Sequence, residues 1–394
     1  MIRRIIRYPY NVAKGSVISH RIRKRIRDRA GLEATAWQQA GKATDCVLEF
    51  LDARRHTPDS LFEYRYSARS SEPVLYASAY ACMALSLLGK LDQLSEAERQ
   101  DWAGYFDSFQ NEDDGLFYDQ AINNDIYADS DWWGARHLAL HMISAYTALG
   151  RTPRYPFRFL QQYYEVGQIG AWLDAFDWTA SIGLVDDVDN KIMNIGCLLQ
   201  YQRDTWKDAE AAKAVSYLQG YLKDRINPET GMWGNWNIDK PQHRSRMVQF
   251  AYHLFPLFLY DRQPLDYPEK IVDLVLKTRN SSGGFGVSVN SSACEDIDSI
   301  DILCRLAASV PERSAEIDTA LHKALSWVLC NQVDDGGFVF RLYEAFTYGH
   351  QEMSSGQNQG AMFPAWFRLL SLAYLARYFG VESFSIKPAP GLQF

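Results

Sequence analysis

The stretch that decides the fold runs from Lys323 to Phe338 and reads KALSWVLCNQVDDGGF. Its first half ends an amphipathic segment in which apolar residues recur at helical spacing. Two glycines and an aromatic residue follow. Glycine permits the positive φ of a turn that stops a helix, and the aromatic ring then covers the groove between neighbouring helices. The stretch therefore predicts an outer helix, a stop and a turn toward a second helix.

The same punctuation recurs at residues 110–117, 229–233 and 280–285. Around these junctions, amphipathic charged segments alternate with segments that are rich in Ala, Leu and aromatic residues. The pattern predicts helices of the charged kind at roughly 34–54, 95–109, 154–165, 207–225, 266–279 and 314–332. It predicts helices of the apolar kind at roughly 73–89, 132–149, 190–201, 246–260, 298–309 and 361–378. A helix that is apolar around most of its circumference is buried on all sides.

This alternation is typical of a repeat protein whose units bury one another, here at a spacing of roughly 50–60 residues. The arrangement that buries every second helix all round is a closed double ring, with six inner helices inside six outer ones. We therefore expect an all-α fold, a single (α/α)6 toroid over residues 32–380. A basic amphipathic arm (1–31) precedes it, and a C-terminal tail (381–394) follows.

At this point the chain resembles a known family. The segment 323–338 is similar to the repeat shared by squalene cyclases and other terpenoid cyclases with protein prenyltransferase β-subunits, in which a helix ending in Trp-Leu precedes Gln, Gly and an aromatic. The resemblance covers most of 34–380 and is strongest over 264–378. It implies the toroid fold. The function stays open, because this fold hosts cyclases, transferases and non-enzymes alike.

Composition excludes several classes of protein. The chain has 394 residues, of which 47% are hydrophobic and 23% charged, so it holds enough material for a large core and is not disordered. It contains no charge-free apolar run of the ~18 residues that a transmembrane helix needs. Its six cysteines include no CxxC pair, which favours a reduced, cytoplasmic setting over a disulfide scaffold or a zinc ribbon.

The charge of the chain is divided unevenly. Residues 1–31 hold ten Lys/Arg and the single acid Asp28, whereas the remaining 363 residues hold 31 basic and 47 acidic residues. Ile18, Ile22 and Ile26 would form a narrow apolar stripe on a basic helix, which is typical of peripheral contact with an anionic membrane surface. Alternatively, the arm is solvated, folds against the acidic body or binds another partner. We expect no nucleic-acid ligand for the acidic ring, which would repel it.

The residues before the inner helices form a candidate mouth. In such a ring the N-terminal ends of the inner helices open toward one face, so the side chains just before them meet there. Acids dominate this set, beyond the one that each helix cap requires. The candidate substrate-binding residues are Asp131, Trp132, Trp133, Asp187, Trp233, Arg246, Tyr348, His350 and Asn358.

The strongest single motif is Cys294-Glu-Asp-Ile-Asp-Ser-Ile300. It is similar to the Asp-x-Asp-Asp element of class II terpene cyclases, where crowded carboxylates keep one aspartic acid protonated so that it can protonate an alkene or epoxide. This resemblance implies Asp296 and Asp298 as catalytic residues, with Asp298 as the proton donor, and Ser299 stands in place of the last acid. Two alternatives remain, in which these acids cap the following helix or bind substrate.

Metal chemistry is weighed in the same way. Protein prenyltransferases hold zinc through an Asp-x-Cys pair and a later His; here Asp298 stands where the Cys would be, although His350 offers a third ligand. Losing the thiolate removes the ligand that such zinc prefers. His137 and His141 are four residues apart and could chelate a metal, but such pairs more often hydrogen-bond within a helix array. We expect no metal and no cofactor.

Three functions therefore stay open. The first is acid-initiated cyclisation or isomerisation of a hydrophobic polyprenyl substrate, since aromatic walls stabilise carbocations. The second is a glycan-active toroid, a hydrolase or lyase in polysaccharide metabolism, because aromatic rings also stack on sugars and paired acids hydrolyse glycosides. Its candidate sets are Asp131 with Asp187, or Tyr348 and His350 with Arg246. The third is a non-catalytic scaffold that binds a partner or a lipid-linked intermediate at the mouth.

Overall fold

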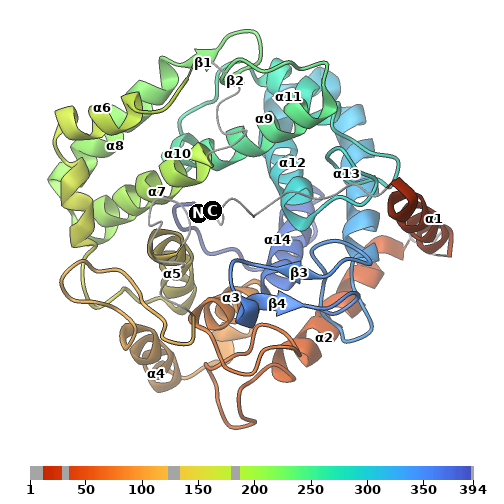
Figure 1. Ribbon diagram of the computed structural model, residues 1–394, viewed down its shortest axis with the longest axis horizontal. Coiled ribbons are helices and arrows are strands. Elements are labelled where there is room, and N and C mark those ends of the chain that lie inside the picture. Colours follow the sequence, from red (N-terminus) through yellow and green to blue (C-terminus); the bar gives the residue numbers. More distant parts are fainter. Residues whose placement is uncertain (1–11, 29–34, 123–133, 179–186, 392–394) are drawn as a thin grey trace.

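The computed structural model describes residues 12–28, 35–122, 134–178 and 187–391. Its helices form two concentric rings (Figure 1), which confirms the all-α (α/α)6 toroid. The inner ring consists of α3 (Leu75–Leu87), α5 (Ala135–Leu149), α7 (Val188–Trp206), α9 (Pro241–Leu254), α12 (Ala293–Leu306) and α14 (Met362–Tyr378). The outer ring consists of α2 (Ala36–Asp52), α4 (Glu96–Asp107), α6 (Val166–Asp174), α8 (Ala209–Lys223), α11 (Pro268–Leu276) and α13 (Ser314–Cys330). Each inner helix contacts the next, and α14 contacts α3, so the inner ring is closed.

Burial separates the two rings as the sequence pattern predicts. In α14 every residue from Met362 to Ala376 is buried, and in α3 all residues but Leu85 are buried. Outer α2 buries only one stripe, made of Ala36, Ala40, Ala43, Val47, Phe50 and Leu51. The difference arises because inner helices are covered by neighbours on all sides, whereas outer helices present one face to water.

The third outer helix differs from the one expected at 154–165. The chain there forms a short 3-10 segment (Arg158–Tyr163), and α6 begins only at Val166. Pro153 and Pro156 precede this segment. Proline lacks an N–H and restricts the residue before it, which delays the start of a regular helix.

Two inner helices begin earlier than expected. The fourth starts at Pro241 instead of 246, because proline suits the first turn of a helix, and it is followed by the short α10 (Pro256–Leu259). The fifth, α12, starts at Ala293 instead of 298, where Ser292 begins it with a capping box. The second shift changes the interpretation of the acidic motif.

Short antiparallel pairs hold the glycine turns at the predicted junctions. One pair is β1 (Ile226–Asn227) with β2 (Met232–Trp233). The others are single bridges, namely Gln110 with Phe117, Arg279 with Phe285 and Gln332 with Phe338. The aromatic residue of each turn is therefore fixed back against the end of its own outer helix.

The last of these turns closes the outer ring. Gly336 has a φ of +83°, and a Cβ atom there would overlap the backbone of Cys46 in α2. The side-chain amide of Gln332 donates to the carbonyl oxygens of Gly336 (2.9 Å) and of Ala43 in α2 (2.8 Å). Gly115 packs in the same way against the outer segment that follows it. The turn after the last outer helix is thereby fastened to the first outer helix.

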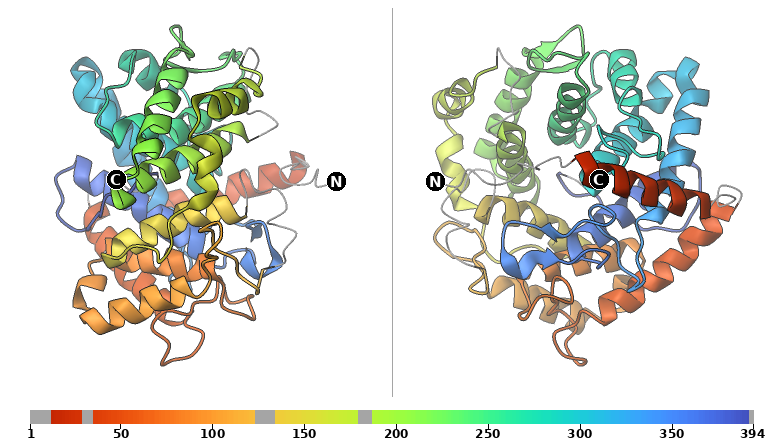
Figure 2. Two further views of the ribbon diagram at one scale, coloured as in Figure 1. Left: turned by 90° about the vertical axis from the view of Figure 1, so that its left-hand side faces the viewer. Right: turned by 45° about the vertical axis from the view of Figure 1, so that its right-hand side comes forward.

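The two ends of the ring differ (Figure 2). One end, which we call the mouth, carries the N-terminal ends of the inner helices with strands β3 (Phe346–Thr347) and β4 (Ser354–Ser355). The C-terminal tail crosses the opposite, closed end. There the Ser385 N–H donates to the Leu87 oxygen (2.9 Å), and Lys387 Nζ donates to the Ala148 oxygen (3.0 Å). The tail thus joins the C-terminal ends of α3 and α5.

The described part of the basic arm is a helix on the outer ring, α1 (Val12–Asp28), which contacts α13 (Figure 1). Ile22 is fully buried in this contact. Arg25 donates from Nε to the Cys330 oxygen (2.8 Å) and from Nη2 to the Gln332 oxygen (2.5 Å). Of the alternatives for the arm, these residues show the one that folds against the body. None of the helices in the described ranges has the length and apolarity needed to cross a bilayer.

Replacing Gly336 tests whether its close approach fastens the ring. Gly336→Ala should lower the free energy of unfolding by about 3 kcal/mol or more, because a strained φ and a backbone overlap both add to the cost. Gly89→Ala is the matched control: Gly89 also has a positive φ (+67°), but no atom lies within 4 Å of its Cβ position. That control should cost about 1 kcal/mol. Equal losses in urea unfolding would contradict the packing role.

Candidate active site

The start of α12 sets the positions of the two acids. The Oγ of Ser292 accepts a hydrogen bond from the Glu295 N–H (3.1 Å), and the Glu295 carboxylate accepts one from the Ser292 N–H (2.8 Å). These two residues satisfy the beginning of the helix, so Asp296 and Asp298 lie inside it. The alternative in which those acids cap the helix is therefore wrong.

Asp298 is buried and unpartnered. Its exposed fraction is 1%, and neither carboxyl oxygen has a hydrogen-bond partner. Burial raises the pKa of Asp298 well above its usual value; only Arg246 opposes this rise, while Glu295 and Asp189 add to it. A carboxylate without donors is costly in such a place, so the group keeps its proton. Asp298 is thus a buried carboxylic acid poised to donate a proton.

Asp296, two residues earlier, has the opposite surroundings. Its carboxylate accepts hydrogen bonds from the Phe285 N–H (3.0 Å), Ser291 Oγ (2.7 Å), Trp327 Nε1 (2.9 Å) and Arg368 Nη1 (2.8 Å). Arg368 is itself fully buried. Four donors favour the charged carboxylate and leave it no free lone pair of suitable geometry. Asp296 therefore fits a positioning residue that ties α12 to α13 and α14, rather than a proton donor.

An ion-paired cluster lies beside Asp298 on α7 and α9. Asp189 is fully buried and pairs with both terminal nitrogens of Arg246, at 2.6 and 2.7 Å. Its carboxylate also meets Nδ1 of His253 at 2.6 Å. Although burial alone would raise it, these two partners hold the pKa of Asp189 below its usual value. The negative charge of Asp298, in turn, raises the pKa of Arg246, which places the two groups near each other.

His253 carries a free ring nitrogen. Its Nδ1 is occupied by Asp189, and among the described residues Nε2 makes no hydrogen bond. With a carboxylate holding the proton on Nδ1, the lone pair lies on Nε2. The cluster thus offers a base near the acid Asp298.

Aromatic rings line the facing side of the inner ring. Tyr348 stacks on Phe363 of α14 with centroids 4.4 Å apart and planes 7° apart. Trp366, one turn further along α14, stacks on Tyr80 of α3 at 5.3 Å and 18°. Cys294 links this wall to the acid, because Asp298 raises the pKa of the Cys294 thiol and Cys294 raises that of Tyr348. The acid therefore neighbours a continuous π surface.

The two histidines of α5 belong to the same wall. His137 is hydrogen-bonded through Nδ1 to the hydroxyl of Tyr76 (2.8 Å) and through Nε2 to that of Tyr348 (3.1 Å). The ring of His141 lies 3.3 Å from His137 between their Nε2 atoms. Burial lowers the pKa of His141 to about 3 and that of His137 well below its usual value. Within the described ranges, no three His, Cys, Asp or Glu side chains form a metal-binding group.

Two of the predicted binding residues lie elsewhere than expected. Trp233 is fully buried, donates from Nε1 to the Leu222 oxygen (2.8 Å) and stacks on Phe258, so it belongs to the core between α8 and α10. Asn358 is exposed in a turn with a φ of +55°, a backbone conformation that asparagine tolerates. Neither location supports a role in substrate binding.

The other predicted residues divide into three groups. Arg246 and Tyr348 lie at the interior cluster described above. Asp187, in a left-handed conformation before α7, lies 3.8 Å from Arg246, and burial raises its pKa. His350 begins a 3-10 turn and accepts from the Glu352 N–H (3.2 Å), so it is held in the mouth loop. Outside the described residues lie Asp131, Trp132 and Trp133.

Sequence reasoning overlooked part of this site. His253 was not among the candidates, although it lies seven residues after Arg246 on the same face of one helix. That spacing was the signal that could have found it. Tyr76, Tyr80 and Phe363 carry no comparable signal, because aromatic residues on an inner helix are ordinarily core residues.

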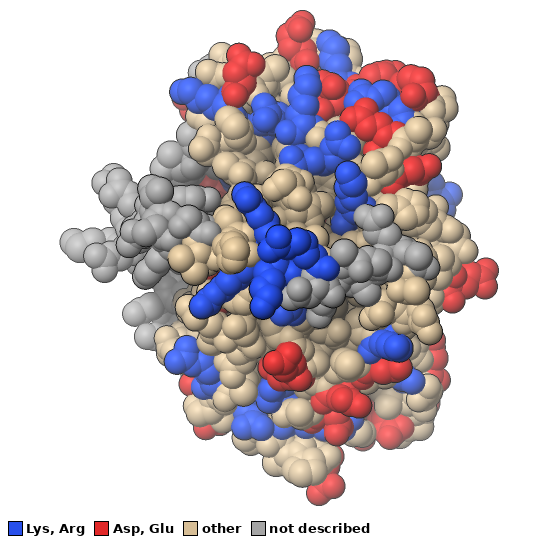
Figure 3. Space-filling view, turned by 90° about the vertical axis from the view of Figure 1, so that its right-hand side faces the viewer, with Lys and Arg blue, Asp and Glu red and all other residues tan. Residues whose placement is uncertain are grey.

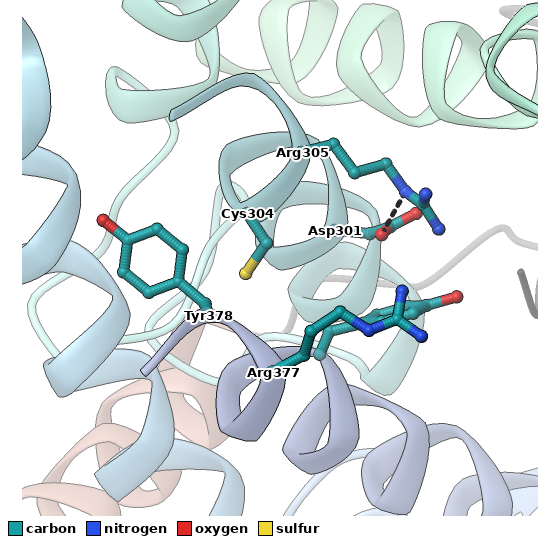
Figure 4. Close-up of a pocket in the computed structure, with 6 residues that line it drawn as sticks. Asp301, Cys304, Arg305, Arg377 and Tyr378 are labelled. Carbon is teal, nitrogen blue, oxygen red and sulfur yellow. Dashed lines mark hydrogen bonds and ion pairs between the residues drawn. The ribbon is translucent and has the colours of Figure 1, made fainter. Parts of the chain in front are cut away.

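A second hollow lies toward the closed end, between the C-terminal halves of α12 and α14. It encloses about 220 Å³ and is lined by Asp301, Cys304, Arg305, Tyr374, Arg377 and Tyr378. Figure 4 shows the two arginines pointing to the same side with Asp301 between them, and Asp301 pairs with Arg305 at 2.6 Å. It is distinct from the site around Asp298.

The two acids of the motif should respond oppositely to replacement by asparagine. Asp296→Asn leaves buried Arg368 without its counter-charge and should cost about 3–5 kcal/mol of unfolding free energy. Asp298→Asn removes an acid that has no donor and should cost nothing at neutral pH. Urea unfolding of both variants measures this contrast.

The pH dependence checks the protonated state of Asp298. The folded protein keeps this proton to a higher pH than the unfolded chain does, so Asp298 loses stability for the fold as pH rises above about 4. The unfolding free energy of the wild type relative to Asp298→Asn should therefore fall with increasing pH. A constant difference between pH 4 and 8 would show that Asp298 is not protonated in the fold.

Comparisons with known proteins bear on this fold. No protein-family model matches the chain, and no curated protein matches its sequence. Among solved structures, type II terpene cyclase MstE from Scytonema, in complex with its substrate geranylgeranyl dihydroxybenzoate, is similar with a TM-score of 0.53 and 13% identity, covering 88% of this chain and 99% of that chain. A polysaccharide lyase has a TM-score of 0.48 and 11% identity, covering 86% and 98%. A glycosyl hydrolase of family 88 from Bacteroides vulgatus has 0.46 and 11%, covering 85% and 99%. The chain therefore has the α/α toroid fold of the terpenoid cyclase type.

Proposed function

We propose that this protein is an enzyme that cyclises or isomerises a polyprenyl substrate by protonating it, with Asp298 as the proton donor. The observation that carries the proposal is the state of Asp298, a carboxyl that is buried and has no hydrogen-bond partner on either oxygen. A protonated carboxylic acid is what the first step of such a reaction requires, since a carboxylate cannot donate a proton.

The first step transfers the Asp298 proton to one carbon of an alkene. The O–H bond breaks, a C–H bond forms from the π electrons, and the other carbon becomes a cation beside the new carboxylate. The nearby charge of Arg246 stabilises that carboxylate, since this cation already counteracts the pKa rise of Asp298. Arg246 is itself held in place by its two bonds to Asp189.

The aromatic wall would stabilise the cation as it moves along the substrate. Ring faces attract positive charge, and the attraction is strongest where water is excluded. The stacked rings of Tyr348, Phe363, Trp366 and Tyr80 are at least mostly buried. Successive alkenes of a polyprenyl chain could then attack the cation and form rings, each step exchanging one π bond for one C–C bond.

The reaction ends when a proton leaves the carbon next to the last cation. His253 is the proposed acceptor, through the free Nε2 that its bond to Asp189 leaves available. A new C=C bond forms, His253 becomes charged beside Asp189, and solvent returns the proton to Asp298. The overall change is an isomerisation, so it needs no oxidant, metal or other cofactor.

The glycan-active alternative fits the site less well. Glycoside hydrolysis uses one carboxyl as acid and a second as nucleophile or base. The carboxylate of Asp189 is the neighbour on α7, but Arg246 and His253 occupy it. Tyr348, which the lyase alternative would pair with His350 and Arg246, is instead bonded to His137. These contacts favour the cyclase over the hydrolase or lyase.

A product assay tests the proposal. Purified protein is incubated with prenyl diphosphates, squalene and oxidosqualene, and the products are analysed by mass spectrometry. We expect a product of unchanged mass and new retention time, and a loss of turnover of about 10²–10⁴-fold in Asp298→Asn. Asp301→Asn is the matched control, because Asp301 is a buried acid of the same helix that pairs with Arg305 outside this site. Turnover that survives in Asp298→Asn would contradict the assignment.

Replacing the proposed base should change the products rather than abolish the first step. His253→Gln keeps a donor toward Asp189 but removes the basic nitrogen. We expect kcat to fall about 10-fold or more, with a larger share of alcohols formed when water captures the cation. An unchanged product ratio measured by gas chromatography would exclude His253 as the acceptor.

A further inference from the structure

The exposed face of α1 is basic. The residues Arg21, Arg23, Lys24 and Arg27 are all exposed on this helix, and within the described ranges none of them forms an ion pair. Figure 3 shows these basic side chains gathered over α1 on one face of the molecule. Elsewhere the chain is acidic, with a net charge of −7. A cluster of unneutralised cations on an acidic protein calls for an anionic partner.

Packing fixes the direction of this face. At 100° per residue, Lys24 and Arg27 lie on the side of the helix opposite Ile22, which is fully buried against α13. Arg25, on the buried side, is bonded to the backbone carbonyls at the end of α13. The apolar stripe is therefore occupied by the protein's own core, and only the cationic face is left for a partner.

The helix also lies beside the mouth. Its buried side contacts Val289 and the segment containing Val339, Leu342 and Tyr343, which lead into the starts of α12 and α14. Figure 2 shows α1 and the β3–β4 hairpin projecting from the same side of the ring, while the C-terminal tail lies on the other side. A surface that binds α1 would therefore face the mouth.

Two exposed apolar residues accompany the cations. Val17 on α1 is 53% exposed, and Val287, in the loop whose Val289 packs against α1, is 41% exposed. A cationic helix with a few apolar side chains at its rim is suited to the headgroup region of an anionic bilayer. Nucleic acid fits less well, because the acidic ring around this one helix would repel a long polyanion.

We propose that the outer face of α1 docks this protein, by electrostatic attraction and without insertion of its isoleucine stripe, on an anionic membrane with the mouth toward the lipid. This inference rests on the proposed function for its purpose, since a polyprenyl substrate is a lipid and would enter from that side. The docking itself needs no catalysis and is tested without substrate.

The experiment is co-sedimentation of the full chain with vesicles of phosphatidylcholine containing about 30% phosphatidylserine, compared with phosphatidylcholine alone. We expect binding only to the anionic vesicles and loss of binding in 0.5 M NaCl. A variant with Arg21→Gln, Arg23→Gln, Lys24→Gln and Arg27→Gln should bind at least about 30-fold more weakly. Its melting temperature should be unchanged, since Ile22 and Arg25 are kept.

A matched control removes four exposed lysines from other parts of the ring, with Lys207, Lys213, Lys223 and Lys277 each replaced by Gln. It has the same net charge as the α1 variant and should bind like the wild type. Asp298→Asn should also bind like the wild type, which separates docking from catalysis. Equal loss in both lysine and α1 variants, equal binding to neutral vesicles, or displacement from vesicles by single-stranded RNA at equal phosphate concentration would overturn the proposal.

Discussion

Closure of the ring is the constraint on which the rest of the structure depends. Gly336 has no side chain, so the turn after the last outer helix can lie on the backbone of Cys46 in the first. Gln332 then bonds across the same junction. Once the ends meet, α14 must pack on α3, and every inner helix is enclosed between neighbours. This explains why the inner helices are apolar all round, and why the polar groups kept among them need specific partners or a proton.

The enclosure gives two acids of one helix turn different chemistry. Asp296 points toward α13 and α14, where four donors, including the buried Arg368, stabilise its charge. Asp298 is rotated about 200° further along the helix and meets no donor. A carboxyl in water would have nearly the same pKa at either position. Inside the ring, the environment separates them into a structural anion and an acid that retains its proton.

The same enclosure organises the groups around Asp298. Asp189, Arg246 and His253 come from two neighbouring inner helices and form one paired cluster, which keeps a cation beside the acid and exposes one basic nitrogen. Opposite them, stacked rings from α3 and α14 form a surface without charge. Acid, base and π surface are therefore held on rigid helices rather than on loops, an arrangement that favours precise chemistry on an apolar substrate.

The sequence by itself determined the architecture, because helical periodicity, charge content and the glycine turns are local signals that act over one or two helix lengths. It also singled out Asp296 and Asp298. It misplaced the start of α12, since the capping box of Ser292 and Glu295 competes with a longer polar loop that reads equally well. What only the tertiary structure decided is which acid is paired and which is bare, that His253 meets Asp189, and that Trp233 is a core residue. It also decided that the isoleucine stripe of α1 faces α13. These outcomes depend on contacts between residues tens to hundreds of positions apart, and the direction of a side chain on a helix changes by about 100° for each residue of error in register.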